Sequence, residues 1–317
     1  MGTATRVPQR RDVVGDELSG DEAWTALRRY GGWSLARDSF IRFRYADGFT
    51  HSRALALQTV LSLVPLAIVA IGLSGVLHTE GIGRVAELTI RRITSGPSQE
   101  MVDEALSLSR RHAGDGGEAA LWLGLLFSLV NVTTSLCQVE RGANRIYGVE
   151  RDRPFLRKYL WGTVMAVLAG LPLGLSFLLT VLGSDLTQAF ADVYGLGPGA
   201  TRAWEVVRWP AGVLLAVLAT SAIFRLSPRR DQPGYTWLAF GAILYLVLWN
   251  AATWGLSLYV GASSSFTSVY GPLSAVMALL LWSYLTSLAL FLGVAFAAQL
   301  EAVRAGVEEP AGPDPGV

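Results

Sequence analysis

Residues 54–77 read ALALQTVLSLVPLAIVAIGLSGVL, an apolar run with no charged side chain. A helix needs about 20 such residues to cross the hydrocarbon of a bilayer. All its backbone N–H and C=O groups must be hydrogen-bonded within the segment, because lipid offers them no partner. The run therefore predicts a transmembrane helix. It decides the fold class, because five further apolar runs of comparable length follow it along the chain.

The five further runs predict five further spans. They cover about residues 119–139, 159–182, 206–224, 235–260 and 272–299. The composition agrees, because 51% of the 317 residues are hydrophobic and only 16% are charged, whereas about a quarter of a soluble domain is charged. We predict an all-α fold: a polytopic membrane protein with six transmembrane helices.

The distribution of arginine between the loops predicts how the spans are oriented. Short cytoplasmic loops are enriched in Lys and Arg. Basic groups precede the first span and separate the second from the third. By contrast, Arg202 is the one basic residue of the loop after the third span, and the loop after the fifth span holds no charge. The long loop 77–118 also carries arginines, but its length makes it a weak indicator, and we place it outside. The sequence thus predicts a bacterial cytoplasmic (inner) membrane protein with both termini in the cytoplasm.

Three regions outside the spans carry patterns of their own. Aromatic residues from Trp33 to Phe49 alternate with arginines before the first span and predict an N-terminal interfacial elbow helix. Helical apolar spacing within 77–118 predicts a short extracytoplasmic amphipathic cap. Residues 1–32 and 306–317 lack periodic apolar content and are predicted to be disordered cytoplasmic tails. This leaves 33–305 as the six-helix membrane domain.

Several classes of function lack the residues that they need. The net charge of +1 offers no basic excess for a nucleic acid partner. The three histidines, His51, His78 and His112, fall on different sides of the predicted topology and cannot share one metal. Cys137 is the only cysteine, so a cysteine metal cluster within one chain is excluded. We therefore predict no enzyme, no catalytic residue, no metal and no cofactor.

Polar side chains gather in one half of the second predicted span. Asn131, Thr134 and Gln138 are substrate-binding candidates, because several polar groups crowd one half of an otherwise apolar helix. The alternative is that they hydrogen-bond neighbouring helices and only support packing.

A basic group follows that span, and Arg141, Asn144 and Arg145 are its binding candidates. Clustered basic residues at a membrane surface attract anionic head groups by about 1 kcal/mol each. They could bind anionic lipid or an anionic substrate, or they could only set the topology. Asn144 favours the first interpretation, because a positive-inside signal does not need an amide.

Proline and glycine mark structural candidates. Pro65 interrupts the backbone hydrogen bonding of the first span, which produces a kink or exposes a carbonyl to a cavity. Gly170 and Gly174 have a spacing that permits close helix contact. Pro272 opens the sixth span after Tyr270 and Gly271, so these residues either begin the helix or present its N-terminus to an anion.

Four stretches, in order and across about residues 40–300, resemble the YihY/BrkB family of bacterial inner-membrane proteins, once labelled ribonuclease BN. They are Ala54–Pro65, Gly142–Gly148 followed by Arg153-Pro154-Phe155, Phe224–Pro228 with Pro233-Gly234 and Gly241-Ala242, and Phe266–Gly293 with Leu280–Tyr284. The resemblance implies a multi-pass protein with six helices, and it implies transport as the usual interpretation of an activity that is unestablished for most members.

The chain departs from the family pattern at two positions. Ala295 stands where relatives tend to carry a carboxylate, and Gln58 stands where they usually carry an aromatic residue. We therefore expect no proton-carrying carboxylate in the sixth span. Glu301 lies about 9 Å further along the helix and is expected to be solvated.

These features favour a membrane transport protein that moves a lipid-linked or amphipathic anion across the cytoplasmic membrane. The alternative is a non-transporting membrane organiser that binds lipid or a protein partner. Membrane lipids and a small-molecule or lipid substrate are the expected partners, and a homo-oligomer is left open.

Overall fold

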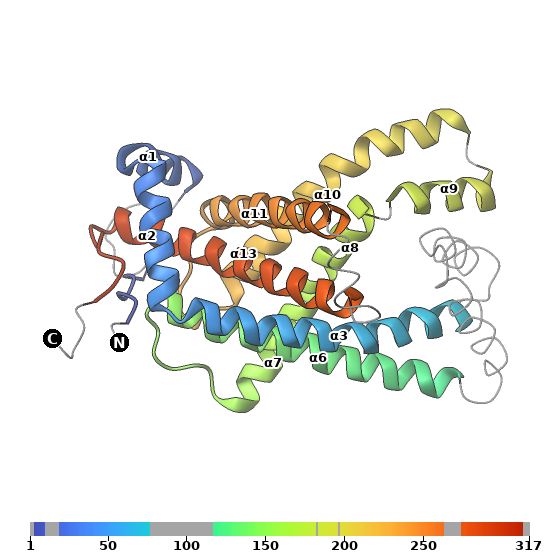
Figure 1. Cartoon of the computed structure of the whole chain (residues 1–317), viewed down its shortest axis with the longest axis horizontal. Helices are drawn as coiled ribbons and strands as arrows, with labels where there is room; N and C mark the ends of the chain where they lie inside the picture. The colour runs from blue at the N-terminus through green and yellow to red at the C-terminus, as the bar shows by residue number, and fades with distance from the viewer. Residues whose placement is uncertain are drawn as a thin grey trace. The chain divides into compact units, whose positions relative to one another are not determined.

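The computed structural model describes residues 3–9, 19–76, 117–181, 183–195, 197–262 and 274–312. Their regular secondary structure is helical (Figure 1), with one isolated antiparallel bridge between Ala4 and Ala311. The all-α prediction is confirmed for these residues. The chain forms two compact units: the first holds residues 1–60, 132–169 and 217–317, and the second holds residues 61–131 and 170–216.

Five helical stretches among the described residues are long and apolar enough to cross a membrane. They are Trp122–Ile146, Phe155–Ser176, Pro198–Leu226, Tyr235–Val260 and Val276–Arg304. They fall on the second to sixth predicted spans. The helices that contain them are α6 (Gly117–Ile146), α7 (Phe155–Met165) with α8 (Leu171–Val181), α10 (Pro198–Leu226), α11 (Tyr235–Ala262) and α13 (Ser274–Arg304). The first predicted span lies in α3, a helix of 29 residues over Gly48–Val76.

The third predicted span is not one regular helix. It consists of α7 (Phe155–Met165), a π turn η2 (Ala166–Gly170) and α8 (Leu171–Val181). Pro172 lacks an N–H, and its ring would clash with the carbonyl four residues earlier in a regular α-helix. The wider π turn directly before it removes this conflict. A further helix, α9 (Gly183–Tyr194), follows in the stretch predicted to be an outer loop.

The fourth span begins earlier than predicted. The sequence placed its start at about residue 206, but α10 begins at Pro198. Proline suits the first turn of a helix, because its missing N–H has no intrahelical acceptor there. The charged side chains Arg202 and Glu205 lie in its first turns, where both are exposed.

Among the described residues, parts of both predicted tails have defined structure. Residues 20–30, placed in a disordered tail, form α1 (Gly20–Tyr30). Acidic residues in its first turn and basic residues in its last turn suit the helix dipole. Ala23 is buried, and α1 packs against α2, α11 and α13. Residues 306–312 also differ from a disordered tail, because they lie against residues 3–9.

A helix, α2 (Gly32–Tyr45), covers most of the stretch predicted to form the elbow, and Phe49 at its end lies in α3. The predicted outer cap falls in residues 77–116, which lie outside the described residues; α6 begins directly after them. In the first unit, α13 packs against α11 and α2. The backbones of α11 and α13 touch at two glycines: a Cβ on Gly241 would lie 2.5 Å from the carbonyl oxygen of Gly293.

The second unit has polar contacts of its own. The hydroxyl of Ser176 on α8 donates to the carbonyl of Gly212 on α10 over 2.7 Å. Arg208, which is 7% exposed, donates to the carbonyl of Leu179 over 3.3 Å. Helices α8 and α9 also contact one another.

Candidate functional site

The loop between α6 and α7 is organised around the carboxylate of Asp152, in the first unit. Asn144 donates to Oδ1 over 2.9 Å, and Lys158 donates to Oδ2 over 2.9 Å. Arg141 lies 3.2 Å from Oδ2. Burial by itself raises the pKa of Asp152, but the hydrogen bonds from Asn144 and Lys158, with the charge of Lys158, outweigh it and lower the pKa to about 2. The carboxylate therefore stays charged at neutral pH.

Arg153 connects this loop by hydrogen bonds to the end of α10 and the segment that follows it. Its guanidinium pairs with Glu140 over 3.1 Å and donates to three consecutive backbone carbonyls, those of Leu226, Ser227 and Pro228. Trp161 on α7 donates to the same Leu226 carbonyl over 2.8 Å. These bonds satisfy carbonyls that the C-terminus of α10 leaves without an intrahelical donor.

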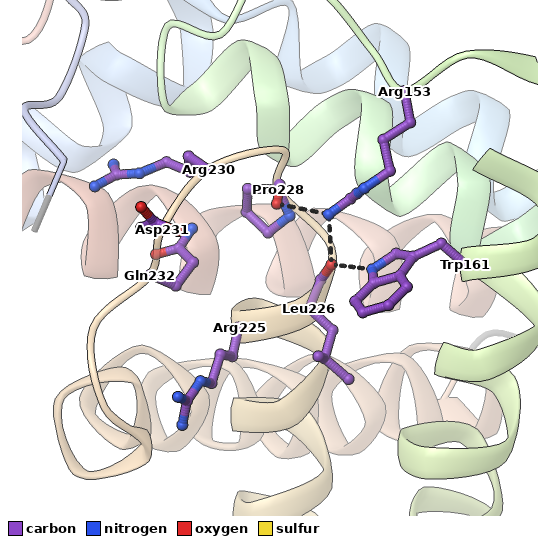
Figure 2. A pocket seen from close by; sticks show the side chains of 8 residues that line it. All are labelled: Arg153, Trp161, Arg225, Leu226, Pro228, Arg230, Asp231 and Gln232. Carbon is purple, nitrogen blue, oxygen red and sulfur yellow. Dashed lines mark hydrogen bonds between the residues drawn. The ribbon is translucent and has the colours of Figure 1, made fainter. Parts of the chain in front are cut away.

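An open cavity of about 540 Å³ lies beside these contacts. In Figure 2, Arg153 and Trp161 meet at Leu226, and Asp231 and Gln232 lie across from them. The complete lining is Arg153, Trp161, Arg225, Leu226, Pro228, Arg230, Asp231 and Gln232. It joins three guanidinium groups and one carboxylate to an aromatic and apolar wall, so it suits a ligand with an anionic and an apolar part.

A second open cavity of about 430 Å³ adjoins the first, because both are lined by Arg153, Arg230 and Asp231. It adds Gln9, Arg157 and Arg229. We call the two together the basic cavities. Their linings contain five arginines against one carboxylate.

Arg42 and the cavity residue Arg230, both in the first unit, are held in a buried polar cluster. Arg42 on α2 is 0% exposed. Its Nε donates to Oε1 of Gln299 over 2.7 Å, and its Nη1 donates to the carbonyls of Thr5 over 2.7 Å and Ile146 over 3.2 Å. Burial lowers the pKa of Arg42 to about 10, so the guanidinium remains charged at neutral pH.

Arg230 forms the other half of this cluster. It is paired with Glu301, donates to the carbonyl of Pro8 over 2.9 Å, and lies 4.5 Å from the ring centre of Tyr147. The expectation that Glu301 is solvated is wrong, because its side chain is 3% exposed. The helix rise places it near the end of α13, but there its carboxylate pairs with Arg230, which also donates to the carbonyl of Pro8.

Two of the candidates in the second predicted span make polar contacts with different partners. Asn131 donates to the carbonyl of Phe127 in its own helix over 2.8 Å. Gln138 lies 3.2 Å from Nδ1 of His51 on α3. Thr134 is half-buried on α6. The Asn131 and Gln138 contacts agree with the packing interpretation, and a substrate role for the three residues stays a prediction.

The three basic candidates all contact the loop between α6 and α7. Arg141 and Asn144 bind Asp152, and the amide oxygen of Asn144 also accepts from the backbone N–H of Arg229 over 2.7 Å. Arg145 donates to the carbonyls of Val149 and Glu150. The structure gives all three a role in holding the loop, and it places other arginines around the basic cavities.

Of the structural candidates, Pro65 lies within α3, and Gly170 ends the π turn. A Cβ on Gly174 would meet no atom within 4 Å among the described residues, so its role in close helix contact stays a prediction. Tyr270, Gly271 and Pro272 lie outside the described residues.

Sequence reasoning missed the partners that make these sites. Arg225, Arg229 and Arg230 lie in a short loop whose basic residues indicate only topology, and Arg42 is one of the arginines between the aromatic residues of the predicted elbow. Nothing local distinguishes a buried arginine from an exposed one in such a stretch. The unusual density of Arg, Gln and Pro in residues 225–233 was the available signal.

The helical fold, the apolar spans and the arginine-lined cavities define a polytopic helical membrane protein. The described residues contain no group of three His, Cys, Asp or Glu side chains placed to hold a metal ion. More particularly, the chain belongs to the family described as virulence factor BrkB, whose model matches residues 39–316.

Curated relatives agree with this assignment. A ribonuclease-like protein, YfkH, of Bacillus subtilis is 22% identical over 262 residues, which cover 82% of this chain and 92% of that protein. A UPF0761 membrane protein of Stenotrophomonas maltophilia is 27% identical over 288 residues, which cover 89% of this chain and 64% of that protein. A UPF0761 membrane protein of Xanthomonas axonopodis is likewise 27% identical, with 65% of its length covered. The chain thus spans just under two thirds of these UPF0761 relatives. No solved structure matches it significantly.

Proposed function

We propose that this protein is a transporter that moves an amphipathic anion, such as an anionic phospholipid, across the bacterial cytoplasmic membrane. The proposal includes six spans, with α3 as the first, and both termini in the cytoplasm. The observation that carries it is the pair of basic cavities at the end of the first unit where α6, α10 and α13 finish.

The lining of the cavities matches an amphipathic anion in two ways. Five arginines face one carboxylate, and guanidinium groups pair well with phosphate oxygens. Trp161, Leu226 and Pro228 add an apolar wall beside them, which would receive the start of an acyl chain or another apolar group. Under the proposed orientation the cavities open at the cytoplasmic leaflet, where basic side chains attract anionic head groups.

An enzymatic function is not part of this proposal. A metal-dependent ribonuclease needs several ligands around one ion, and His51 instead lies beside Gln138 at 3.2 Å. The ribonuclease-like name belongs to the Bacillus relative.

A second candidate function is a membrane organiser that binds lipid or a protein partner without moving anything. The observation that favours it is the exposure of aromatic side chains on α2, where Trp33 is 85% and Phe40 is 48% exposed. Such side chains suit the membrane interface or a partner surface.

Proteoliposomes separate the two functions. Purified protein is reconstituted with a trace of fluorescent phosphatidylglycerol, and dithionite reports how much label reaches the outer leaflet. A transporter raises the accessible fraction above that of protein-free liposomes. An organiser binds the lipid and leaves this fraction at the protein-free value, which would refute the transport proposal for this lipid class.

A further inference from the structure

The segment 3–9 crosses the end of the first unit as an extended strap. Ala4 bridges Ala311, flanked by a bond from Thr5 N–H to the Pro310 carbonyl of 3.1 Å and one from Gly312 N–H to the Thr3 carbonyl of 3.0 Å. Val7 N–H donates to the Tyr147 carbonyl over 3.2 Å. We call residues 3–9 the strap.

The strap covers two arginines and accepts from both. Arg42 donates to the carbonyl of Thr5 over 2.7 Å, and Arg230 donates to the carbonyl of Pro8 over 2.9 Å. The Arg230 side chain is 1% exposed, and Arg42 is 0% exposed. The strap therefore supplies neutral acceptors where two buried cations need an anion.

The charge of this cluster is not balanced. Arg42 and Arg230 carry two positive charges, and among the residues that the structure describes Glu301 is the one carboxylate that pairs with either of them. Nη2 of Arg42 and both Nε and Nη1 of Arg230 have no hydrogen-bond acceptor among the described residues. Burying a charge without a counter-charge, or a donor without an acceptor, is costly. An oxyanion would remove both costs at once.

We propose that Arg42 and Arg230 form a phosphate-binding site beneath the strap, and that a phosphate group displaces the carbonyls of Thr5 and Pro8 from them. A phosphate offers several charged acceptors to two guanidinium forks, whereas each carbonyl offers one neutral oxygen. The phosphate can come from a lipid head group or from free phosphate. The site does not depend on transport.

The surroundings provide a route to this site. The strap residue Gln9 and Arg230 both line one of the basic cavities. The strap also borders a cavity of about 770 Å³, which shares Gln9 and Arg229 with that basic cavity. Its lining contains the four arginines Arg6, Arg145, Arg151 and Arg229 and the two carboxylates Asp47 and Glu150. An anion can therefore approach along arginine side chains to the edge of the strap. Because few backbone bonds hold the strap, its release is a local opening and does not require unfolding.

A reversible disulfide tests the site without altering either arginine. Ala4 and Ala311 face each other between two flanking hydrogen bonds, an antiparallel arrangement with Cα atoms about 4.5 Å apart, within the range of a disulfide. Ala4→Cys/Ala311→Cys is made in a Cys137→Ser background. Binding of inorganic phosphate is measured in detergent by calorimetry, before and after reduction.

The reduced protein is expected to bind phosphate, and the oxidised protein is expected to bind it at least tenfold more weakly, with binding restored by reductant. The single variant Ala4→Cys, treated identically, controls for oxidation and should bind in both states. Equal affinity in the oxidised and reduced double variant would overturn the proposal, because the strap would then not cover the site.

A second measurement identifies the source of the phosphate. Val7 is 1% exposed, so Val7→Cys in the Cys137→Ser background reports strap release by its rate of reaction with a thiol reagent. An increase with inorganic phosphate in phosphatidylcholine nanodiscs indicates free phosphate. An increase with phosphatidylglycerol nanodiscs in phosphate-free buffer indicates a lipid head group. No increase in either arm would overturn the proposal, whatever the outcome of the flux assay.

Discussion

At the scale of single residues, the loop between α6 and α7 depends on one buried amide. Asn144 is 0% exposed, and it donates to Asp152 while it accepts from Arg229. Both partners would be left without this bond if the amide were removed. Arg141 binds the same carboxylate, but its side chain is 54% exposed, and exposed ion pairs contribute little to stability.

We expect Asn144→Ala to lower the free energy of unfolding by about 1–3 kcal/mol, the cost of leaving buried polar groups unsatisfied. Arg141→Gln is the matched control at the same carboxylate and should change it by less than about 1 kcal/mol. Thermal unfolding of the two variants in detergent, followed by fluorescence, makes the comparison. Equal losses would mean that the amide does not hold the loop.

The sequence indicated Asn144 as a binding candidate, because an amide stood out among arginines, and that role stays a prediction. The structure adds contacts that the sequence did not predict, with Asp152 and Arg229. For Glu301 the prediction was wrong. Its distance along the helix predicted solvation, but its carboxylate pairs with Arg230, which is remote in sequence, and no local pattern reveals which distant residue lies at a helix end.

At the scale of helices, the contact of α11 with α13 rests on the absence of side chains at two positions. A Cβ on Gly241 would lie 2.5 Å from the Gly293 carbonyl, and one on Gly293 would lie 2.7 Å from the Gly241 carbonyl. Both distances are too short for a non-bonded contact between a methyl carbon and a carbonyl oxygen, so a methyl group at either position would push the helices apart. Small residues permit such close approach between membrane helices.

Gly241→Ala is therefore expected to destabilise the first unit by about 1–3 kcal/mol through overpacking. Gly255→Ala in the same helix is the control, because a Cβ there meets no atom within 4 Å among the described residues. Alanine also forms helix better than glycine, so this control should be neutral or slightly stabilising. Melting temperatures from a thermal shift assay would compare the two. A neutral Gly241→Ala would contradict the close contact.

Apolar run length predicted which segments become long helices, because the bilayer imposes that length on any span. It did not predict the irregularities. The π turn before Pro172 depends on how one proline is accommodated, and the early start of α10 at Pro198 depends on charged residues tolerated in its first turns. The helix α1 forms in a segment predicted to lack periodic apolar content, although Ala23, Leu27 and Tyr30 recur at helical spacing there. Contacts with α2, α11 and α13 accompany it.

At the scale of the whole molecule, the orientation in the membrane decides where the basic cavities open. A cysteine at Ser98 in a Cys137→Ser background is expected to react with an impermeant thiol reagent in intact cells, because the loop 77–118 lies outside in the proposed topology. A cysteine at Arg151 is expected to react only after lysis. The reverse pattern would place the cavities at the outer leaflet.

In the proposed function, the basic cavities select an amphipathic anion for transport. The most direct test of this selection is the rate at which proteoliposomes move fluorescent phosphatidylglycerol relative to fluorescent phosphatidylcholine, compared among native protein, Arg225→Gln and Arg37→Gln. Arg225 lines a basic cavity, whereas Arg37 is an exposed arginine of α2 outside the linings of both basic cavities. We predict that Arg225→Gln lowers the preference for phosphatidylglycerol by roughly fivefold or more, in line with about 1 kcal/mol per basic residue, and that Arg37→Gln leaves it unchanged. An unchanged preference in Arg225→Gln, with flux intact, would contradict this selection.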